Sequence, residues 1–210
     1  MGTLYWQMND VWPVVSWSSV DVFGRWKPLH YRARSLYGTF FAEAQTIGDT
    51  VRVRLVSDSR GAFSGVLVAE AFDVRTGRAR TDALPMRLAP GEARTVALHP
   101  RAALGLPDSL VVYRLRLMDE RGQTRLDTRS TLASPWRLAL ADPSLCIERQ
   151  GDRLTITATR VALGVWLEDE ATGVNLPVNY LDLWPGVPVT VDVPAGTAVT
   201  IRSLFDARRR

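Results

Sequence analysis

The sequence predicts a mainly β protein: two immunoglobulin-like β-sandwiches preceded by a short segment of a different kind. Apolar and polar residues alternate strictly over 51–55 and 113–117, and turn-forming residues separate such stretches, as at 75–77. Alternation with period two places one face of a strand on a core and the other face in water. Four of the seven tryptophans fall within the first 26 residues, so the opening segment differs chemically from the rest. Short strands at this spacing are typical of a sandwich.

The opening segment, residues 1–37, is predicted to form a strand, a loop and a helix. Residues 3–7 are β-branched and aromatic, which predicts a strand. Trp12-Pro13 and Phe23-Gly24 predict a loop. Residues 29–37 carry apolar residues near helical spacing and predict a short helix. Such a unit is no domain by itself, because its apolar face needs partners that these three pieces do not supply.

The remaining chain is expected to form two sandwiches, over residues 38–135 and 136–210. The first has the length of one immunoglobulin-like domain, about 100 residues. Ser134-Pro135 is the predicted hinge. The second sandwich is smaller, and small domains bury a smaller share of their surface. We therefore expect it to pack against a neighbouring part of the protein for stability. Its predicted strands cover residues 154–158, 165–168, 189–193 and 199–204.

The composition indicates which kinds of partner the chain is expected to bind. Hydrophobic residues make up 46% of the chain, enough for a core, and the net charge is +4. The positive charge is almost all arginine, since Lys27 is the only lysine. The arginines are spread along predicted strands and not clustered, so we expect a solvated basic surface and no nucleic-acid partner. Residues 1–10 lack the pattern of a signal peptide. No apolar run is long enough to span a bilayer, so no membrane partner is expected.

Few residues are candidates for catalysis. Glycoside hydrolysis usually needs two carboxylates on opposite sides of the scissile bond. Asp10 follows a predicted strand end, where barrel enzymes keep their site residues, and Asp21 lies deep in the loop. The Glu168-Asp169-Glu170 cluster precedes a Thr-Gly turn and is expected to be a solvated hairpin end. We therefore predict no acid/base pair in this chain.

Cysteine and histidine point to no other chemistry. Cys146 is the single cysteine, which excludes an internal disulfide, and its apolar neighbours predict a buried position. There is no His/Cys cluster with metal-ligand spacing and no Gly-rich phosphate loop, so neither metal nor cofactor is expected. The three later tryptophans are far apart in sequence and are expected in the core: Trp136, Trp166 and Trp184.

The early tryptophans have the composition of a carbohydrate site. Tryptophan packs its face against the C–H faces of sugars and also donates a hydrogen bond. Here these side chains alternate with amide and carboxylate residues: Trp6, Trp12, Trp17 and Trp26 with Gln7, Asn9 and Asp10. Large aromatics also dominate hydrophobic cores, so the pattern alone favours a core role for these tryptophans over a sugar site.

A resemblance to a known family carries the functional prediction further. Residues 2–13 (GTLYWQMNDVWP), 16–19 (SWSS) and 24–31 (GRWKPLHY) closely resemble the end of the catalytic barrel in β-mannosidases of glycoside hydrolase family 2. In that family the first stretch is the eighth barrel strand and the last leads into the final helix. Residues 179–186 (NYLDLWPG) look like the terminal immunoglobulin-like domain of the same enzymes.

The resemblance implies a function for the complete enzyme. The family removes terminal β-linked mannose from saccharides with retention of configuration, and its two catalytic glutamates lie at the ends of barrel strands four and seven. Both positions would precede residue 1, so the resemblance implies no catalytic residue here. Trp6 matches the tryptophan that forms an apolar wall beside the sugar. Asn9, Asp10 and Trp12 match positions at the mouth of that site, which makes all four candidate substrate-binding residues.

The implied partners are the upstream catalytic barrel of the same protein and, through the complete enzyme, a β-mannoside saccharide. The chain alone is expected to be inactive. A carbohydrate-binding module and a structural immunoglobulin-like pair remain alternatives, although neither needs a barrel strand and helix. Without the barrel, the aromatic segment would expose apolar surface. We therefore expect that segment to pack on a sandwich, to self-associate with another copy, or to be poorly ordered.

Overall fold

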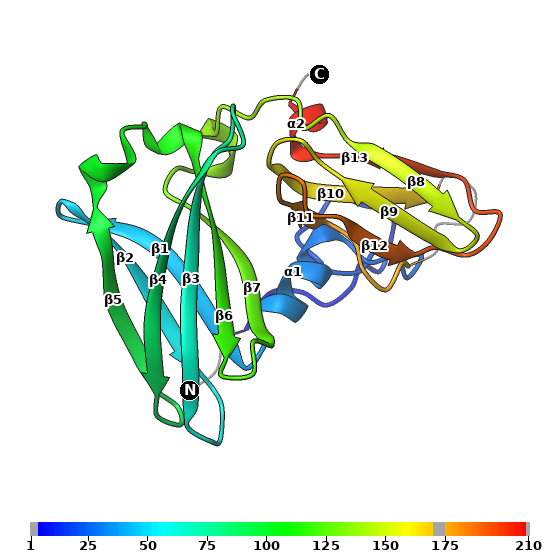
Figure 1. Ribbon diagram of the computed structural model, residues 1–210. Coiled ribbons are helices and arrows are strands. Elements are labelled where there is room, and N and C mark those ends of the chain that lie inside the picture. The colour runs from blue at the N-terminus through cyan, green and yellow to red at the C-terminus, as the bar shows by residue number, and fades with distance from the viewer. Residues whose placement is uncertain (1–3, 170–174, 209–210) are drawn as a thin grey trace. The chain divides into compact units, whose positions relative to one another are not determined.

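A computed structural model of the chain describes residues 4–169 and 175–208. The chain divides into two compact units, residues 38–142 and residues 1–37 together with 143–210. Both are built mainly from antiparallel sheets, which confirms the predicted fold class (Figure 1). Among the described residues, no helix is both long enough and apolar enough to cross a membrane.

The unit of residues 38–142 is a two-layered sandwich. One sheet has the order β1-β2-β5 and the other β4-β3-β6-β7 (Figure 1). The strands are β1 (Phe40–Ile47), β2 (Thr50–Ser57), β3 (Phe63–Asp73), β4 (Ala79–Leu88), β5 (Ala93–Pro100), β6 (Val111–Asp119) and β7 (Thr124–Thr131). Three short 3-10 turns accompany them: η1 (Arg101–Leu104), η2 (Asp108–Leu110) and η3 (Pro135–Arg137).

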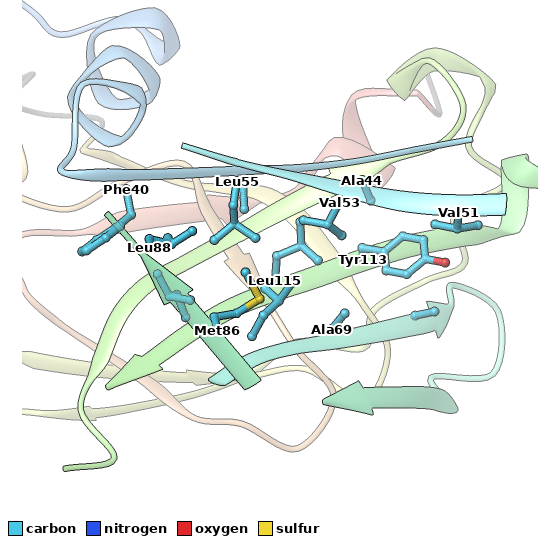
Figure 2. Packing of buried hydrophobic residues seen from close by; sticks show 14 of the residues in the cluster. Phe40, Ala44, Val51, Val53, Leu55, Ala69, Met86, Leu88, Tyr113 and Leu115 are labelled. Carbon is cyan, nitrogen blue, oxygen red and sulfur yellow. The ribbon is translucent and has the colours of Figure 1, made fainter. Parts of the chain in front are cut away.

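The predicted alternation builds the core between these two sheets. Val51, Val53 and Leu55 of β2 are fully buried, while the residues between them face outward and stay partly or fully exposed. Figure 2 shows these side chains pointing toward Tyr113 and Leu115 of β6. Each sheet therefore gives one apolar face to a shared core, as period-two patterning requires.

The other unit contains a smaller sandwich with sheets ordered β12-β9-β8 and β11-β10-β13. Its elements are β8 (Cys146–Gln150), β9 (Arg153–Thr157), β10 (Ala162–Asp169), β11 (Leu181–Leu183), β12 (Val189–Asp192), β13 (Val199–Arg202) and α2 (Leu204–Ala207). All four strands predicted for this region form. The core between the sheets includes Leu154, Ile156, Val165, Leu183 and Val191.

The stretch 179–186 serves this small sandwich directly. The Asn179 side chain accepts a hydrogen bond from the Leu167 N–H (2.8 Å) and donates one to the Leu167 carbonyl (2.9 Å). It thus satisfies two backbone groups of β10, which would otherwise need a neighbouring strand. Asp182 accepts from the Gly164 N–H at 3.0 Å, and Trp184 is buried.

Two burial predictions were wrong. Cys146 is exposed, because it lies on β8, an edge strand whose residues are all exposed. Trp136 is 73% exposed, because it lies in the single turn η3 and on no strand of either sheet. Trp184 is buried as expected, and Trp166 is half-buried.

The opening segment differs from its prediction in one element. The helix α1 (Pro28–Leu36) confirms the expected helix with a shift of one residue. The described part of the predicted strand, residues 4–7, is not in a strand. Isolated bridges join Asn9 to Val20 and Val20 to Trp26 instead. A strand is stabilised by pairing with neighbours, and this segment has no sheet to join among the described residues.

Candidate functional site

The candidate site is built on three stretches of backbone from the opening segment. The Asp10 N–H donates to the Val20 carbonyl, and the Val20 N–H donates to the Met8 carbonyl, both at 3.0 Å. The Lys27 N–H donates to the Ser19 carbonyl at 2.9 Å. These bonds hold the stretch after Met8, the stretch before Val20 and the start of α1 side by side.

A partly buried ion pair lies inside this scaffold. Asp10 is only 3% exposed, and one of its carboxylate oxygens accepts a hydrogen bond from Lys27 Nζ at 2.6 Å. The other oxygen accepts from the Ser16 hydroxyl. Lys27 Nζ also donates to Ser18 Oγ at 2.7 Å, and Ser18 Oγ donates to the Val20 carbonyl at 3.0 Å. The ammonium, the carboxylate and two hydroxyls therefore form one connected polar network.

The electrostatics keep Asp10 ionised. The hydrogen bond from Lys27, and after it the bond from Ser16, hold the pKa of Asp10 below its usual value. A general acid in glycoside hydrolysis needs the opposite, a raised pKa that keeps its proton near neutral pH. Asp10 therefore fits a structural anion better than a proton donor.

Asp21 is also held in place by its neighbours. Burial alone would raise the pKa of Asp21, but hydrogen bonds from the backbone and side chain of Arg25 and from the Phe23 N–H outweigh it, so the pKa is lowered. The carboxylate accepts from both backbone N–H groups at 2.9 Å and from Arg25 Nε at 2.6 Å. Asp21 thus closes the turn before α1.

Three of the four early tryptophans point into solvent. Trp6 is 73% exposed, Trp12 64% and Trp17 68%. Several other apolar side chains of the same segment are also exposed: Leu4, Met8, Val11, Val14, Val15 and Phe23. The core interpretation is therefore wrong for these three tryptophans. Exposed apolar patches of this kind are common where proteins bind a ligand or another protein.

Asn9 is the exposed polar residue among these aromatics. Its side-chain amide donates to the Asp10 carbonyl at 3.2 Å, and the Gln7 amide donates to the Asn9 carbonyl at 3.1 Å. Of the four predicted substrate-binding residues, Trp6, Asn9 and Trp12 are thus accessible. Asp10 is buried below them.

Trp26 has a different role from the other three tryptophans. It is half-buried and stacks on His30 of α1 at a ring-centroid distance of 4.7 Å. The Tyr31 ring lies edge-on to it at 5.7 Å and contacts the Tyr180 ring at 5.4 Å. Tyr180 in turn lies 6.4 Å from Trp166 of β10. This series of rings packs α1 on the small sandwich.

Hydrogen bonds reinforce that packing. Asn175 accepts from the Trp26 N–H at 2.6 Å and donates to the Gly24 carbonyl at 2.8 Å. The Tyr31 hydroxyl donates to the Leu176 carbonyl at 2.9 Å, and Arg34 donates to the Pro177 carbonyl at 3.0 Å. The opening segment therefore packs on a sandwich, which is one of the three arrangements expected from the sequence.

The sequence pattern missed the residues that hold the site together. Lys27, Ser16, Ser18 and Asn175 are ordinary polar residues in a one-dimensional reading, and only the fold brings them to their partners. The remaining carboxylate cluster adds nothing to the site: Glu168 is exposed at the end of β10, and Glu170 lies outside the described residues. Among residues 4–169 and 175–208, no group of three or more His, Cys, Asp or Glu side chains is placed to hold a metal ion.

Comparison with known proteins gives a consistent picture. Residues 140–207 match the family Ig_mannosidase, described as an Ig-fold domain. β-Mannosidase A of Aspergillus clavatus is 29% identical over the whole of this chain, which covers 26% of that protein. The β-mannosidase of Bos taurus is 52% identical over 48 residues, which are 23% of this chain and 5% of that protein. The chain thus spans about a quarter of the length of the first relative.

Solved structures share the fold. The β-D-mannosidase of Dictyoglomus thermophilum matches with a TM-score of 0.70 and 18% identity, over 94% of this chain and 25% of that one. An exo-chitosanase of Amycolatopsis orientalis matches with a TM-score of 0.63 and 15% identity, over 95% of this chain and 29% of that one. At these identities the likeness concerns architecture, and it confirms the sandwiches described above.

Proposed function

We propose that this chain, which is homologous to the C-terminal part of family 2 β-mannosidases, completes the catalytic barrel of a retaining enzyme that removes terminal β-D-mannose from saccharides. In this proposal residues 1–37 supply the stretch that pairs as the last strand once the barrel is complete, together with its helix, and residues 38–135 and 136–210 are accessory sandwiches. The observation that carries it is the exposure of Trp6, Trp12 and Trp17 on a segment that forms no sheet of its own.

The exposed side chains suit the wall of a sugar site. Trp6 offers a flat apolar face on which the C–H face of a mannose ring can stack. Asn9 offers both a donor and an acceptor for sugar hydroxyls, and Trp12 adds a second apolar face with an N–H donor. Asp10 stands behind this surface and holds the loop through Lys27 and Ser16. The wall supplies binding and orientation and moves no proton.

The reacting carboxylates are proposed to come from the preceding part of the barrel. Asp10 and Asp21 are the carboxylates of the aromatic segment, and both have a lowered pKa and hydrogen-bonded oxygens. Neither is suited to donate a proton to a leaving group near neutral pH. The chain alone is therefore expected to be inactive.

The test is hydrolysis of p-nitrophenyl β-mannoside by the chain alone and after mixing with the polypeptide that carries the preceding barrel strands. We expect no turnover by the chain alone and turnover after mixing. Trp6→Ala should then reduce kcat/KM on the order of 10-fold or more, because stacking that strengthens in the transition state is lost. Trp136→Ala is the matched control, since Trp136 is equally exposed at 73% but lies in the other unit.

Two results would contradict this proposal. Turnover by the chain alone would mean that its own carboxylates react, and Asp10→Asn and Asp21→Asn would identify which of them does. Equal losses for Trp6→Ala and Trp136→Ala would mean that the exposed aromatic segment does not face the sugar.

A carbohydrate-binding role without catalysis is the second candidate. The same exposure favours it, because solvent-facing tryptophans also form the platforms of sugar-binding modules. Titration of the chain alone with a β-1,4-linked manno-oligosaccharide, followed by tryptophan fluorescence, separates the two roles. Saturable binding without any partner polypeptide, lost in Trp12→Ala, would favour the module. An unchanged signal favours a wall that works only in the completed barrel.

A further inference from the structure

Lys27 occupies a position where its residue type is locally unfavourable. It is the N-cap residue of α1, and no side chain accepts a hydrogen bond at that cap. N-cap positions favour Ser, Thr, Asp or Asn, whose oxygens satisfy free backbone N–H groups. The N-terminus of a helix also carries partial positive charge, which disfavours a cation. A residue that breaks a local rule in this way is often retained for another purpose.

The contacts of Lys27 indicate that purpose. Its ammonium binds Asp10 at 2.6 Å and Ser18 at 2.7 Å, with Ser16 at the longer distance of 3.5 Å. These partners lie between 9 and 17 residues before Lys27 in the chain. The Lys27 side chain therefore adds a polar contact across the loop that precedes α1, beside the backbone bonds from Asp10, Val20 and Lys27.

The same contacts decide which way two tryptophans face. Trp17 stands between Ser16 and Ser18, and Ser18 is buried at 2% exposure while Trp17 is 68% exposed. Because both flanking serines are held inward by the polar network, the indole between them is directed outward. Trp12 is 64% exposed and lies in the stretch between Asp10 and Ser16, whose side chains bond to each other within the same network.

We propose that Lys27 is the positioning residue of the sugar-facing loop, and that its bonds to Asp10 and Ser18 hold Trp12 and Trp17 in the orientation in which they meet the substrate. Lys27 touches no substrate itself and acts through these two partners. The role of the tryptophans rests on the function proposed above, whereas the fixation of the loop is a property of this chain alone. An experiment can therefore refute the proposed function and leave the fixation of the loop standing, or the reverse.

The sequence provides a direct probe of this residue. Because Lys27 is the only lysine, acylation by an amine-reactive ester modifies a single side chain besides the N-terminal amine. Its side chain is 22% exposed and its ammonium is engaged in hydrogen bonds. In the folded chain we expect Lys27 to be acylated at least about 10-fold more slowly than in urea, with the N-terminal amine as internal reference. Equal rates in the two states would overturn the proposal.

Loop fixation is tested with Lys27→Met, which keeps most of the side-chain length but removes the charge and the donors. Lys27→Arg keeps the charge and the donors. Hydroxyl-radical labelling of the chain alone reads the environment of Trp12 and Trp17. Lys27→Met should change their oxidation rates by about 3-fold or more and leave Trp136 unchanged, and Lys27→Arg should restore most of the wild-type pattern. Unchanged rates in Lys27→Met would overturn the proposal.

If Lys27→Met does not fold, Asp10→Asn tests the same contact from the other side. It keeps the volume of the carboxylate but removes the charge that holds the ammonium, so Lys27 should be acylated faster while the small sandwich stays folded. No change in the acylation rate of Asp10→Asn would contradict the role assigned to this pair.

The final arm uses the mixture with the preceding barrel polypeptide. A residue that positions the sugar wall should lower kcat/KM on the order of 10- to 100-fold when removed, at a temperature where the variant is fully folded, and Lys27→Arg should recover most of the loss. A residue that only stabilises the fold would leave kcat/KM per folded molecule unchanged, which would overturn the positioning role. A wild-type mixture without activity would instead count against the proposed function, while the labelling results still decide whether Lys27 fixes the loop.

Discussion

The middle sandwich and the aromatic opening segment follow opposite rules. In the sandwich, alternate residues of β2 and β6 are fully buried and the large aliphatic side chains meet across the two sheets. In the opening segment, three of the four tryptophans are more than 60% exposed, and its buried residues are polar: Asp10, Ser18 and Ser19. The sandwich is stabilised by its buried apolar side chains, whereas the opening segment is held by hydrogen bonds between polar groups and exposes its apolar side chains.

The difference separates a part of the chain that is stable by itself from a part that we propose faces a partner. The apolar core of the middle sandwich is buried within one unit and needs no partner. Its strand pattern, its turns and its packing all favour the same fold. A segment that buries ions and exposes indoles is incomplete by the same standard. Departures of this kind are expected at functional sites. Each of the following changes tests one side of the comparison.

The largest effect on stability is expected from a cavity in the middle core. Leu115 is fully buried between the two sheets. Leu115→Ala should lower the free energy of unfolding of this unit by about 2–5 kcal/mol, through lost burial and the cavity left behind. Urea denaturation followed by circular dichroism measures it. A loss of unfolding free energy no larger than that caused by substituting an exposed residue would contradict a core position for Leu115.

A smaller loss is expected where two strands approach closely. A Cβ added at Gly65 of β3 would lie 2.0 Å from the Met118 carbonyl oxygen, so the backbone must shift. Gly65→Ala should destabilise by about 1–3 kcal/mol, as overpacking does. Gly61→Ala is the control, because its Cβ would meet no atom within 4 Å. Equal midpoints of urea unfolding for the two variants would contradict this account.

A hydrogen bond between His99 and Tyr113 lies inside the middle unit. His99 Nδ1 lies 2.9 Å from the Pro100 carbonyl, and His99 Nε2 is hydrogen-bonded to the Tyr113 hydroxyl at 3.0 Å. Tyr113→Phe leaves Nε2 without this partner and should lower the free energy of unfolding by about 1–3 kcal/mol near neutral pH.

The same substitution has a signature in alkali. Burial is the main cause that raises the pKa of Tyr113 above its ordinary value. A raised folded-state pKa contributes stability that is complete below the unfolded-state pKa, about 10, and is lost as the pH rises above it. The fall in the free energy of unfolding between about pH 9 and 11 should be shallower in Tyr113→Phe. An identical slope in both proteins would contradict it.

Asn175 tests the attachment of the opening segment. Its side chain makes the two hydrogen bonds to Trp26 and Gly24, and Asn175→Ala removes both. We expect the local opening free energy of the Trp26 amide to fall by about 1–2 kcal/mol. Native-state hydrogen exchange measures it, with amides of β3 as the reference that stays unchanged. Unaltered exchange at Trp26 would show that the aromatic rings and the bonds from Tyr31 and Arg34 hold α1 without Asn175.

The smallest effect is expected from the exposed aromatics themselves. Trp12→Ala should change the free energy of unfolding of the isolated chain by less than about 0.5 kcal/mol, as ordinary surface substitutions do. Thermal unfolding of the two proteins side by side measures it. A loss comparable to that of Leu115→Ala would mean that Trp12 has a packing partner within the chain.

Sequence reasoning recovered the elements that follow local rules. Period-two alternation predicted the strands around 51–55 and 113–117, and the helical spacing near residue 30 predicted α1. It failed at Cys146, because apolar neighbours do not tell an edge strand from a central one. It failed at Trp136 for a similar reason, since a bulky aromatic after a hinge need not enter either core.

The candidate site was predicted only in part. Composition and the resemblance indicated the aromatic residues and Asn9, and the structure places Trp6, Asn9 and Trp12 at the surface. The pattern gave no sign that Asp10 would be buried against Lys27. That contact depends on a loop that folds back over 17 residues, and no local periodicity encodes it.

We propose that the exposed indoles meet the rest of a catalytic barrel and its sugar. Hydroxyl-radical footprinting of the chain in three states tests this most directly. These states are the chain alone, the chain mixed with the preceding barrel polypeptide, and that mixture with a mannose-configured inhibitor. The account predicts protection of peptide 4–25 on mixing, further protection of Trp6 by the inhibitor, and constant labelling of Trp136. Equal labelling of Trp6, Trp12 and Trp17 in all three states would contradict it.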